Sequence, residues 1–191
     1  MEVCVFCASV SRIDPAFVEC ARAVGTWIGE RGHTLVWGGC NVGLMNEVGL
    51  AARAAGARTV AVIPGFMVER GLAFDPCTER VVTQDLADRK AEFRRRADTF
   101  VALPGGVGTW EEVLEVLALR KLERLEAPIV LANINRYYDP LLAMLQRSVE
   151  EGFSPPDLLH LFEALPDTGA VLARLESPAP RRAGLDLGPV G

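Results

Sequence analysis

The residues best suited to chemistry stand between Thr99 and Glu115, in the sequence TFVALPGGVGTWEEVLE. The apolar, β-branched run at 99–103 is typical of a buried strand, and Pro104 ends it because proline cannot donate to a sheet ladder. Glycines follow, and their backbone N–H groups are not shielded by side chains. A helix is expected directly after them, so its free N–H groups and the positive end of its dipole point at the same spot. This order predicts a phosphate-binding loop.

Two better-known phosphate loops do not match this one, whose glycines are Gly105, Gly106 and Gly108. A Walker loop requires Gly-Lys-Ser/Thr, whereas Gly108 is followed by Thr109. The dinucleotide fingerprint requires a third glycine at the position that Glu111 occupies. We therefore expect the loop to hold a monophosphate rather than a pyrophosphate.

Glu112 is the carboxylate in this segment with two interpretations. With Thr109 as the N-cap, the spacing T-x-x-E is a capping box, in which the glutamate bonds back to the start of the helix. Because the glycine turn offers its own N–H groups to a ligand, the carboxylate instead faces that ligand in the second interpretation. Glu115 shares this helix face, either as a second binding residue or as a solvated charge.

Cations are supplied by a charged helix expected over 85–98. Arg89 and Arg96 are seven residues apart and share a face with Phe93, and such a face can make bidentate contacts to an anion. The alternative is a solvated basic face balanced by acidic neighbours. Because Arg89 is expected on the surface, its replacement by alanine should change the free energy of unfolding by no more than about 0.5 kcal/mol.

A second strand, glycine turn and helix occur over 34–55, with Gly38, Gly39 and Gly43 in the turn. This turn either joins the ligand site or only allows close packing of helix and strand. Apolar strands separated by helices predict an α/β fold, a Rossmann-like three-layer arrangement with a mostly parallel sheet and helices on both faces. Both glycine turns, and a loop with Ser9 after the first strand, then lie at the carboxyl ends of strands, where ligands bind. The expected strands are 3–7, 34–37, 58–63, 79–83, 99–103 and 128–132.

The composition of the 191 residues fits one domain over 1–176 with a tail at 177–191 that is rich in proline and glycine. The net charge of −5 argues against general affinity for nucleic acids or anionic membranes. Five scattered cysteines, with no signal peptide or apolar run long enough for a membrane span, indicate a reduced cytoplasmic protein. Cys4 and Cys7 form a C-x-x-C within an apolar run, so buried strand cysteines are favoured over a redox pair.

The segment Pro104–Glu112 (PGGVGTWEE) resembles PGGxGTxxE, the signature of the Lonely Guy family of cytokinin-activating phosphoribohydrolases, proteins often labelled lysine-decarboxylase-like. The resemblance covers about 1–175 in the same order. Cys40 and Asn46 depart from glycines that are usual in the family. The other matching residues are Arg89-Lys90, Gly38-Gly39, Gly43-Leu44-Met45 and Cys7-Ala8-Ser9.

The resemblance implies a Rossmann-like homodimer that hydrolyses the N-glycosidic bond of N6-modified adenosine 5′-monophosphates, such as N6-isopentenyl AMP, to free base and ribose 5-phosphate. The family's catalytic arginine and glutamate correspond to Arg89 and Glu112. No metal or other cofactor is expected, and no lysine context supports pyridoxal-dependent decarboxylation. The residues expected to bind the nucleotide are Ser9, Gly39, Gly43, Lys90, Gly105, Gly106, Gly108, Thr109 and Glu115.

Two other hypotheses assign the chain a binding function in place of catalysis. The first is a non-catalytic carrier of a nucleotide or of the molybdenum cofactor on the same fold, against which the presence of both Arg89 and Glu112 argues. The second is a module for single-stranded nucleic acid that uses the basic residues 94–96. The acidic net charge and the lack of an exposed aromatic series argue against the second hypothesis.

Overall fold

Strands and helices alternate along residues 1–177, the part of the chain that the computed structural model describes. The tail expected at 177–191 lies outside the described residues from position 178 onward. The strands are β1 (Glu2–Phe6), β2 (Thr34–Trp37), β3 (Arg58–Pro64), β4 (Glu79–Thr83), β5 (Thr99–Ala102), β6 (Ile129–Ala132) and β7 (Glu163–Leu165). The α-helices are α1 (Pro15–Glu30), α2 (Gly43–Ala54), α3 (Gly65–Glu69), α4 (Leu86–Arg96), α5 (Val107–Lys121), α6 (Asp139–Glu150) and α7 (Thr168–Glu176), and the short 3-10 helices are η1 (Ile134–Arg136) and η2 (Pro156–His160).

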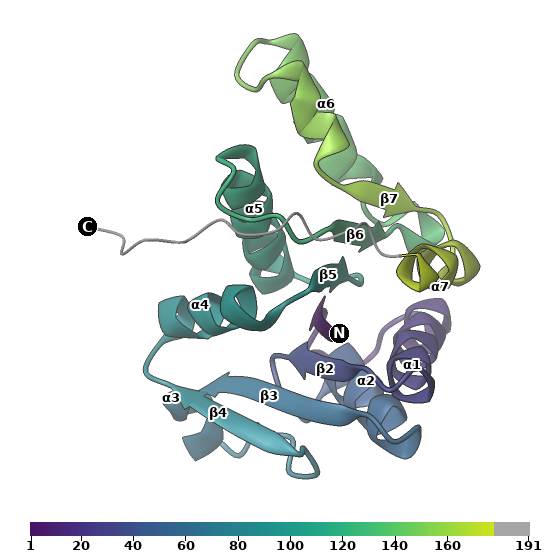
Figure 1. Cartoon of the computed structure of the whole chain (residues 1–191), viewed down its shortest axis with the longest axis vertical. Coiled ribbons are helices and arrows are strands. Elements are labelled where there is room, and N and C mark those ends of the chain that lie inside the picture. The colour runs from purple at the N-terminus through teal and green to yellow at the C-terminus, as the bar shows by residue number, and fades with distance from the viewer. Residues whose placement is uncertain (178–191) are drawn as a thin grey trace.

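The strands form one parallel sheet in the order β4-β3-β2-β1-β5-β6-β7 (Figure 1). The central strand β1 pairs with β2 on one side and β5 on the other, so that Cys4 lies in register with both Val36 and Phe100. The chain builds the sheet outward from β1 to β4 and then returns to the other side of β1 with β5. In an open parallel sheet, ligands bind at this reversal point, outside the carboxyl ends of the two strands.

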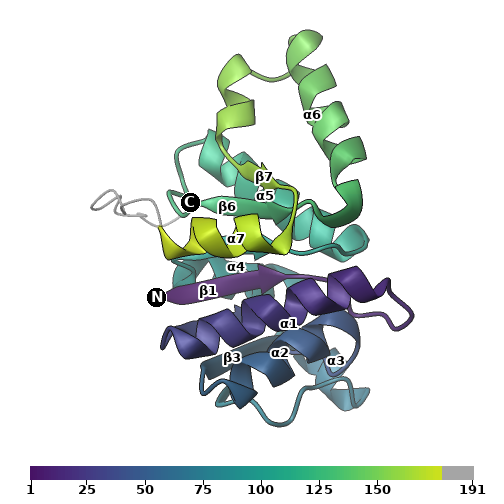
Figure 2. The ribbon, with the colours of Figure 1, turned by 90° about the vertical axis from the view of Figure 1, so that its right-hand side faces the viewer.

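Helices cover both faces of the sheet and make it the middle of three layers. In Figure 2, α1, α2 and α7 lie in front of the sheet, and α4 and α5 lie behind it. Alternate residues of each strand face the two layers: Val3 and Val5 belong to one core, and Cys4 and Phe6 belong to the other. The apolar strands predicted this double burial, and the predicted three-layer α/β fold is confirmed.

The predicted strands agree with the structure within one residue at their ends, apart from one strand that was missed. β7 has only three residues, Glu163–Leu165, and pairs with β6 at the edge of the sheet. Its short, partly exposed sequence contains no apolar run from which a strand can be predicted. The residues that precede it include the 3-10 helix η2.

Candidate active site

The glycine loop between β5 and α5 lies at the reversal point of the sheet. Helix α5 begins at Val107, and its N-cap is Gly106, which makes no side-chain cap because it has no side chain. The first turn closes through a 3.0 Å hydrogen bond from the Trp110 N–H to the Gly106 carbonyl. The prediction that Thr109 is the N-cap is therefore wrong, since the N-cap lies three residues earlier. A capping box between Thr109 and Glu112 is excluded with it.

Glu112 instead faces Arg89 from the neighbouring helix α4. Arg89 Nη1 donates to Glu112 Oε1 over 2.9 Å, and Arg89 Nε donates to the carbonyl oxygen of Val62 over 3.0 Å. The guanidinium also stands 5.0 Å from the centre of the Phe93 ring. Arg89 is 8% exposed and Glu112 is 4% exposed. The expectation of a surface arginine is wrong, because the side chain extends from α4 toward Val62 of β3 rather than into solvent.

Gly38 gives the guanidinium the space it needs. A Cβ atom built on Gly38 would stand 2.0 Å from Arg89 Nη2, which is far closer than atoms can approach. Gly39 and Gly43 have φ of +61° and +64°, a conformation that glycine adopts without strain. A Cβ on Gly43 would also collide with the backbone of Val10, at 2.4 Å from its carbonyl oxygen. This second glycine turn therefore positions α2 and the loop after β1 against the site.

A cavity of about 290 Å³ opens above the buried pair, close to the lower end of the usual size of small-ligand sites, roughly 300–1,000 Å³. Of the residues expected in the site from sequence, it brings together Arg89, Glu112, Ser9, Gly106, Gly108 and Thr109. Gly39, Gly43 and Gly105 do not line the cavity. Gly43 lies against Val10 and Gly105 lies against Thr109, and both of these neighbours line it. Lining residues that were not among the predicted site residues are Cys7, Ala8, Val10, Met45, Met67 and Val107.

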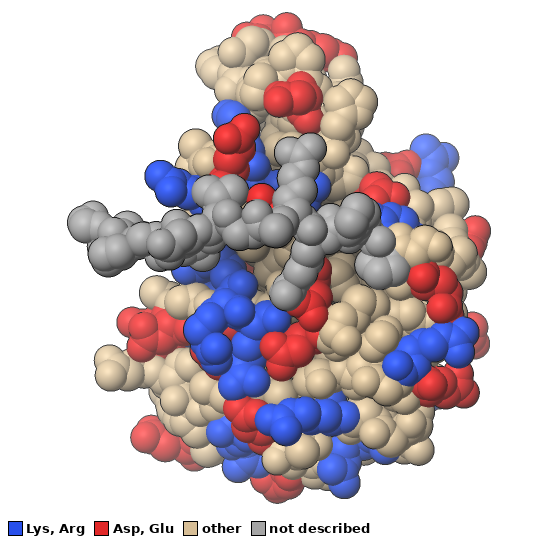
Figure 3. All heavy atoms as spheres, viewed as in Figure 1, with Lys and Arg blue, Asp and Glu red and all other residues tan. Residues whose placement is uncertain are grey.

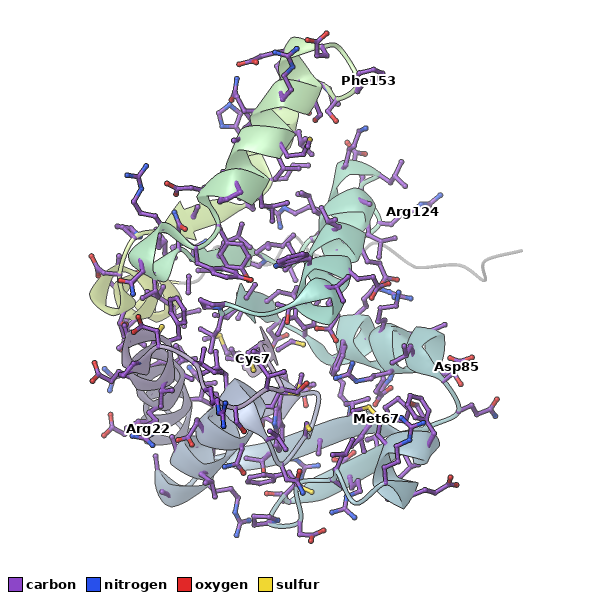
Figure 4. All side chains as sticks on the ribbon, turned by 180° about the vertical axis from the view of Figure 1, so that it is seen from behind. Cys7, Arg22, Met67, Asp85, Arg124 and Phe153 are labelled. Carbon is purple, nitrogen blue, oxygen red and sulfur yellow. The ribbon has the colours of Figure 1, made fainter. Side chains whose placement is uncertain are left out.

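Two of these additional lining residues, Cys7 and Met67, are labelled in Figure 4, with Cys7 near the middle of the molecule and Met67 below α4. The matched motifs contain Cys7, Ala8, Met45 and Val107. Their positions next to predicted site residues in these motifs could therefore have identified them from the sequence. Met67 lies on α3, in a stretch whose periodicity predicts no definite element. Only the folded chain places its side chain opposite the glycine loop.

Lys90 and Glu115 lie in an ion-pair cluster beside the cavity rather than in its lining. Lys90 pairs with Glu111 and also with Glu115, at 3.3 Å from Glu115 Oε2. Arg94 pairs with the other oxygen of Glu115 at 2.5 Å. The cluster joins the outer faces of α4 and α5. It fixes the spacing of the two helices that carry Arg89 and Glu112.

Arg96 points to the opposite end of α4 from Arg89. It forms ion pairs with Glu79 at 2.6 Å and with Glu92 at 2.5 Å, while Arg95 also pairs with Glu92. Figure 3 shows Lys and Arg gathered over α4 with acidic side chains next to them. This arrangement is a balanced surface and leaves Arg89 as the arginine that reaches the cavity from α4.

The electrostatics of the pair favour acid–base chemistry near neutral pH. Burial raises the pKa of Glu112 from 4.5 to about 7, and the positive charge of Arg89 limits the rise. A carboxyl group with this pKa exchanges protons readily at neutral pH. Perturbed carboxyl groups in cavities are typical of catalytic sites, and the free N–H groups of the α5 start lie beside this one.

The structure thus combines a Rossmann-like sheet, a glycine loop at its reversal point and a buried Arg–Glu pair that lines the same cavity as that loop. The family model described as "Possible lysine decarboxylase" matches residues 45–175. A probable cytokinin riboside 5′-monophosphate phosphoribohydrolase of Oryza sativa subsp. japonica is 40% identical over 178 residues, which are 93% of this chain and 78% of that protein. A cytokinin riboside 5′-monophosphate phosphoribohydrolase of Arabidopsis thaliana is 34% identical over 96% of this chain and 80% of its own length.

The chain belongs to the Lonely Guy family, as these matches over most of its length show. Among solved structures, the molybdenum cofactor binding protein of Rippkaea orientalis has a TM-score of 0.71 at 20% identity, covering 92% of this chain and 95% of its own. The molybdenum cofactor carrier protein of Chlamydomonas reinhardtii has a TM-score of 0.69 at 22% identity, covering 92% of this chain and 95% of its own. At these identities the two structures share the fold with this chain, and the likeness carries no statement about its activity.

Proposed function

We propose that this protein hydrolyses the N-glycosidic bond of adenosine 5′-monophosphates, N6-modified ones in particular, to give the free base and ribose 5-phosphate. The observation that carries the proposal is the buried Arg89–Glu112 pair, which lines the same cavity as the glycine loop at the start of α5. The names of the Oryza sativa and Arabidopsis thaliana relatives describe this activity on cytokinin riboside 5′-monophosphates.

The 5′-phosphate would bind at the start of α5. The N–H groups of the first helical turn lack partners within a helix and attract an anion, aided by the helix dipole. Gly106 and Gly108 have no neighbouring atoms within 4 Å of an added Cβ, so the backbone is open on this side. Binding energy from the phosphate would hold the ribose at a fixed distance from Glu112.

Glu112 would act on the bond between C1′ of the ribose and N9 of the base. As that bond breaks, its electron pair leaves with the base and positive charge grows on the ribose ring. An ionised Glu112 stabilises this charge and takes a proton from a water molecule, whose oxygen forms the new bond to C1′. The departing base takes up a proton. Arg89 holds the carboxylate in place and keeps it ionised against the effect of burial.

The first test compares 5′-monophosphates with the corresponding nucleosides. AMP and N6-isopentenyl AMP should release base, whereas adenosine and N6-isopentenyl adenosine should be cleaved at least about 100-fold more slowly, because the phosphate contacts orient the ribose. Chromatography of the released base measures both rates. Similar kcat/KM values for AMP and adenosine would contradict the proposed role of the glycine loop.

The rate should also depend on pH through Glu112. Only the ionised carboxylate accepts a proton, so kcat/KM should fall about tenfold per pH unit below the pKa of about 7 and level off above it. The stability of the fold should depend on pH in the opposite direction, falling as the pH rises. Because the pKa in the folded protein lies above the usual 4.5, the contribution of this group to stability is complete below pH 4.5 and is lost as the pH rises through about 7.

These two pH dependences are measured by kcat/KM profiles and by thermal melts of the parent and of the Glu112→Gln variant. The variant should lack the part of the melting-temperature profile that comes from Glu112. A kcat/KM that is constant from about pH 6 to 8 would contradict the requirement for an ionised carboxylate.

Water is the only co-reactant in this proposal. Within residues 1–177, no three His, Cys, Asp or Glu side chains gather as a metal site. Among the same residues, no helix is long and apolar enough to cross a membrane. We also propose a cytoplasmic location, which the five free cysteines support because they would be kept reduced there.

We propose that two copies of the chain associate through α5. Val107, Trp110, Leu114 and Leu122 are 77%, 43%, 43% and 65% exposed, and their spacing places them along one side of the helix. A run of exposed apolar side chains of this kind is typical of a protein interface. The cavity is lined by Val107, so this surface adjoins the site.

Substitution of Trp110 and Leu114 together by serine should convert the dimer to a monomer in light scattering coupled to size exclusion. Met144→Ser is the matched control, because Met144 is 66% exposed but lies on α6. A parent protein that is monomeric at micromolar concentration would contradict the proposal, as would a double variant that remains dimeric.

A further inference from the structure

Three consecutive carbonyl groups in the loop after β5 are all bound by donors from other parts of the chain. The hydroxyl of Tyr138 donates to the Leu103 carbonyl over 2.7 Å, and the hydroxyl of Tyr137 donates to the Gly105 carbonyl. Between them, the Ala8 N–H donates to the Pro104 carbonyl over 3.2 Å. Neighbouring tyrosines thus hold the loop on either side of its proline.

The directions of the Pro104 and Gly105 carbonyls determine the directions of the N–H groups of Gly105 and Gly106, whereas Pro104 itself has no N–H. In a trans peptide, the C=O and the following N–H point to opposite sides, and the described chain has no cis peptide. Because the Gly105 carbonyl points toward Tyr137, the Gly106 N–H points away from it. Gly106 lines the cavity, and among residues 1–177 no acceptor is found for its N–H. The Tyr137 hydroxyl thus holds the Gly105 carbonyl oxygen on the side opposite to the Gly106 N–H.

The segment directly before the two tyrosines has an unusual backbone conformation. Asn135 and Arg136 are consecutive non-glycine residues with φ of +52° and +61°, in the left-handed region. Such conformations persist only where surrounding contacts hold them, and they cluster at functional sites. Here the side chain of Asn133 accepts from the Tyr138 N–H over 2.7 Å and donates to Asp139 over 2.8 Å. This bend brings both hydroxyls to one loop.

Packing fixes the two rings as well. The Tyr137 and Tyr138 rings are 5.1 Å apart and nearly perpendicular, and Tyr137 makes a similar edge contact with Phe17 of α1 at 5.9 Å. Tyr138 is 1% exposed. The hydroxyls therefore have little freedom to leave the loop. Removal of one hydroxyl would keep this ring packing and would take away only the hydrogen bond to the loop.

We propose that Tyr137 and Tyr138 are positioning residues for the 5′-phosphate, which they serve by fixing the carbonyls of the glycine loop so that its N–H groups face the ligand. The inference rests on the proposed function, because it assumes that the loop binds the phosphate. Neither tyrosine lines the cavity, so neither acts on the substrate directly. Their effect is on affinity for the phosphate, which lies away from the bond that breaks.

The test is Tyr137→Phe, with affinity for ribose 5-phosphate measured by calorimetry and kinetics measured by base release from AMP. Loss of an aligned contact to a charged group corresponds to about 10- to 100-fold weaker binding. We expect ribose 5-phosphate affinity to fall and KM to rise by this factor, with kcat within about threefold of the parent, the pattern of lost uniform binding. A merely structural role would lower the melting temperature and leave KM unchanged.

Arg136→Gly is the matched control in the same segment, because it keeps both hydroxyls and removes a side chain from a left-handed position. It should bind ribose 5-phosphate like the parent. Tyr138→Phe is the second variant and should weaken binding in the same direction. Unchanged ribose 5-phosphate affinity in Tyr137→Phe would overturn the inference, and so would a parent protein that does not bind this compound. If ribose 5-phosphate binding weakens while no protein releases base, the inference stands and the proposed hydrolysis fails.

Discussion

Replacement of Glu112 by glutamine should lower kcat by about 10²- to 10⁴-fold, the range typical of a lost acid–base group. An amide cannot take a proton from water or stabilise a cationic ribose through a negative charge. Its oxygen can still accept the hydrogen bond that Arg89 donates over 2.9 Å, so the melting temperature should stay near that of the parent. Base release and thermal melting of the same preparation measure the two effects.

Two further variants sharpen this comparison. Glu111→Gln is the matched control, because Glu111 is the preceding residue but its side chain is 54% exposed and pairs with Lys90 outside the cavity. It should retain activity. Glu112→Ala should lose activity and also stability, by about 3–5 kcal/mol, because it leaves the buried Arg89 charge without its partner. A Glu112→Gln variant with near-normal turnover would remove Glu112 from the mechanism.

Displacement of the Arg89 guanidinium should lower kcat by about 10²- to 10³-fold, whether by Arg89→Lys or by Gly38→Ala. A lysine has one compact ammonium group and cannot reproduce the separate bonds to Val62 and Glu112. The added methyl group of Gly38→Ala would stand 2.0 Å from the present position of Arg89 Nη2. Because the far end of a flexible side chain can move aside, the fold should survive while the pair separates.

Gly65→Ala is the control for the glycine substitution, since a Cβ at Gly65 has its nearest neighbour at an ordinary 3.7 Å. It should keep parental activity. Arg89→Ala differs from Arg89→Lys and Gly38→Ala because it deprives the buried Glu112 of its hydrogen-bond partner. It should therefore reduce the free energy of unfolding by about 1–3 kcal/mol. Kinetic assays and denaturant titrations measure these effects. Normal turnover in Gly38→Ala would show that the position of the guanidinium is not critical.

The sequence was sufficient to predict the fold because its strands are apolar on both faces. A strand such as Val3–Phe6, with no polar alternation, can only be buried between two layers of helices. Pro104 and the glycines after it marked the loop, and the helix predicted after them is present as α5. β7 was missed because three residues with a leading glutamate carry no periodic pattern.

The details of the site depended on three-dimensional contacts that spacing does not reveal. Thr109 was predicted as the N-cap from the preference of threonine for that position, but the N-cap is a glycine three residues earlier, Gly106. Arg89 was predicted on the surface of a charged helix, yet its guanidinium lies over the Phe93 ring and donates a hydrogen bond to the Val62 carbonyl. Helical spacing places residues on a common face but does not tell which face meets the core.

Incubation of the purified protein with N6-isopentenyl AMP, followed by quantification of free base, ribose 5-phosphate and intact nucleotide, distinguishes hydrolysis from binding. We expect equal amounts of base and ribose 5-phosphate over many turnovers, with at least about 100-fold less product from the Glu112→Gln variant. Stoichiometric binding of the nucleotide, with all of it recovered intact, would show that the protein does not hydrolyse it and would indicate a carrier on the same fold.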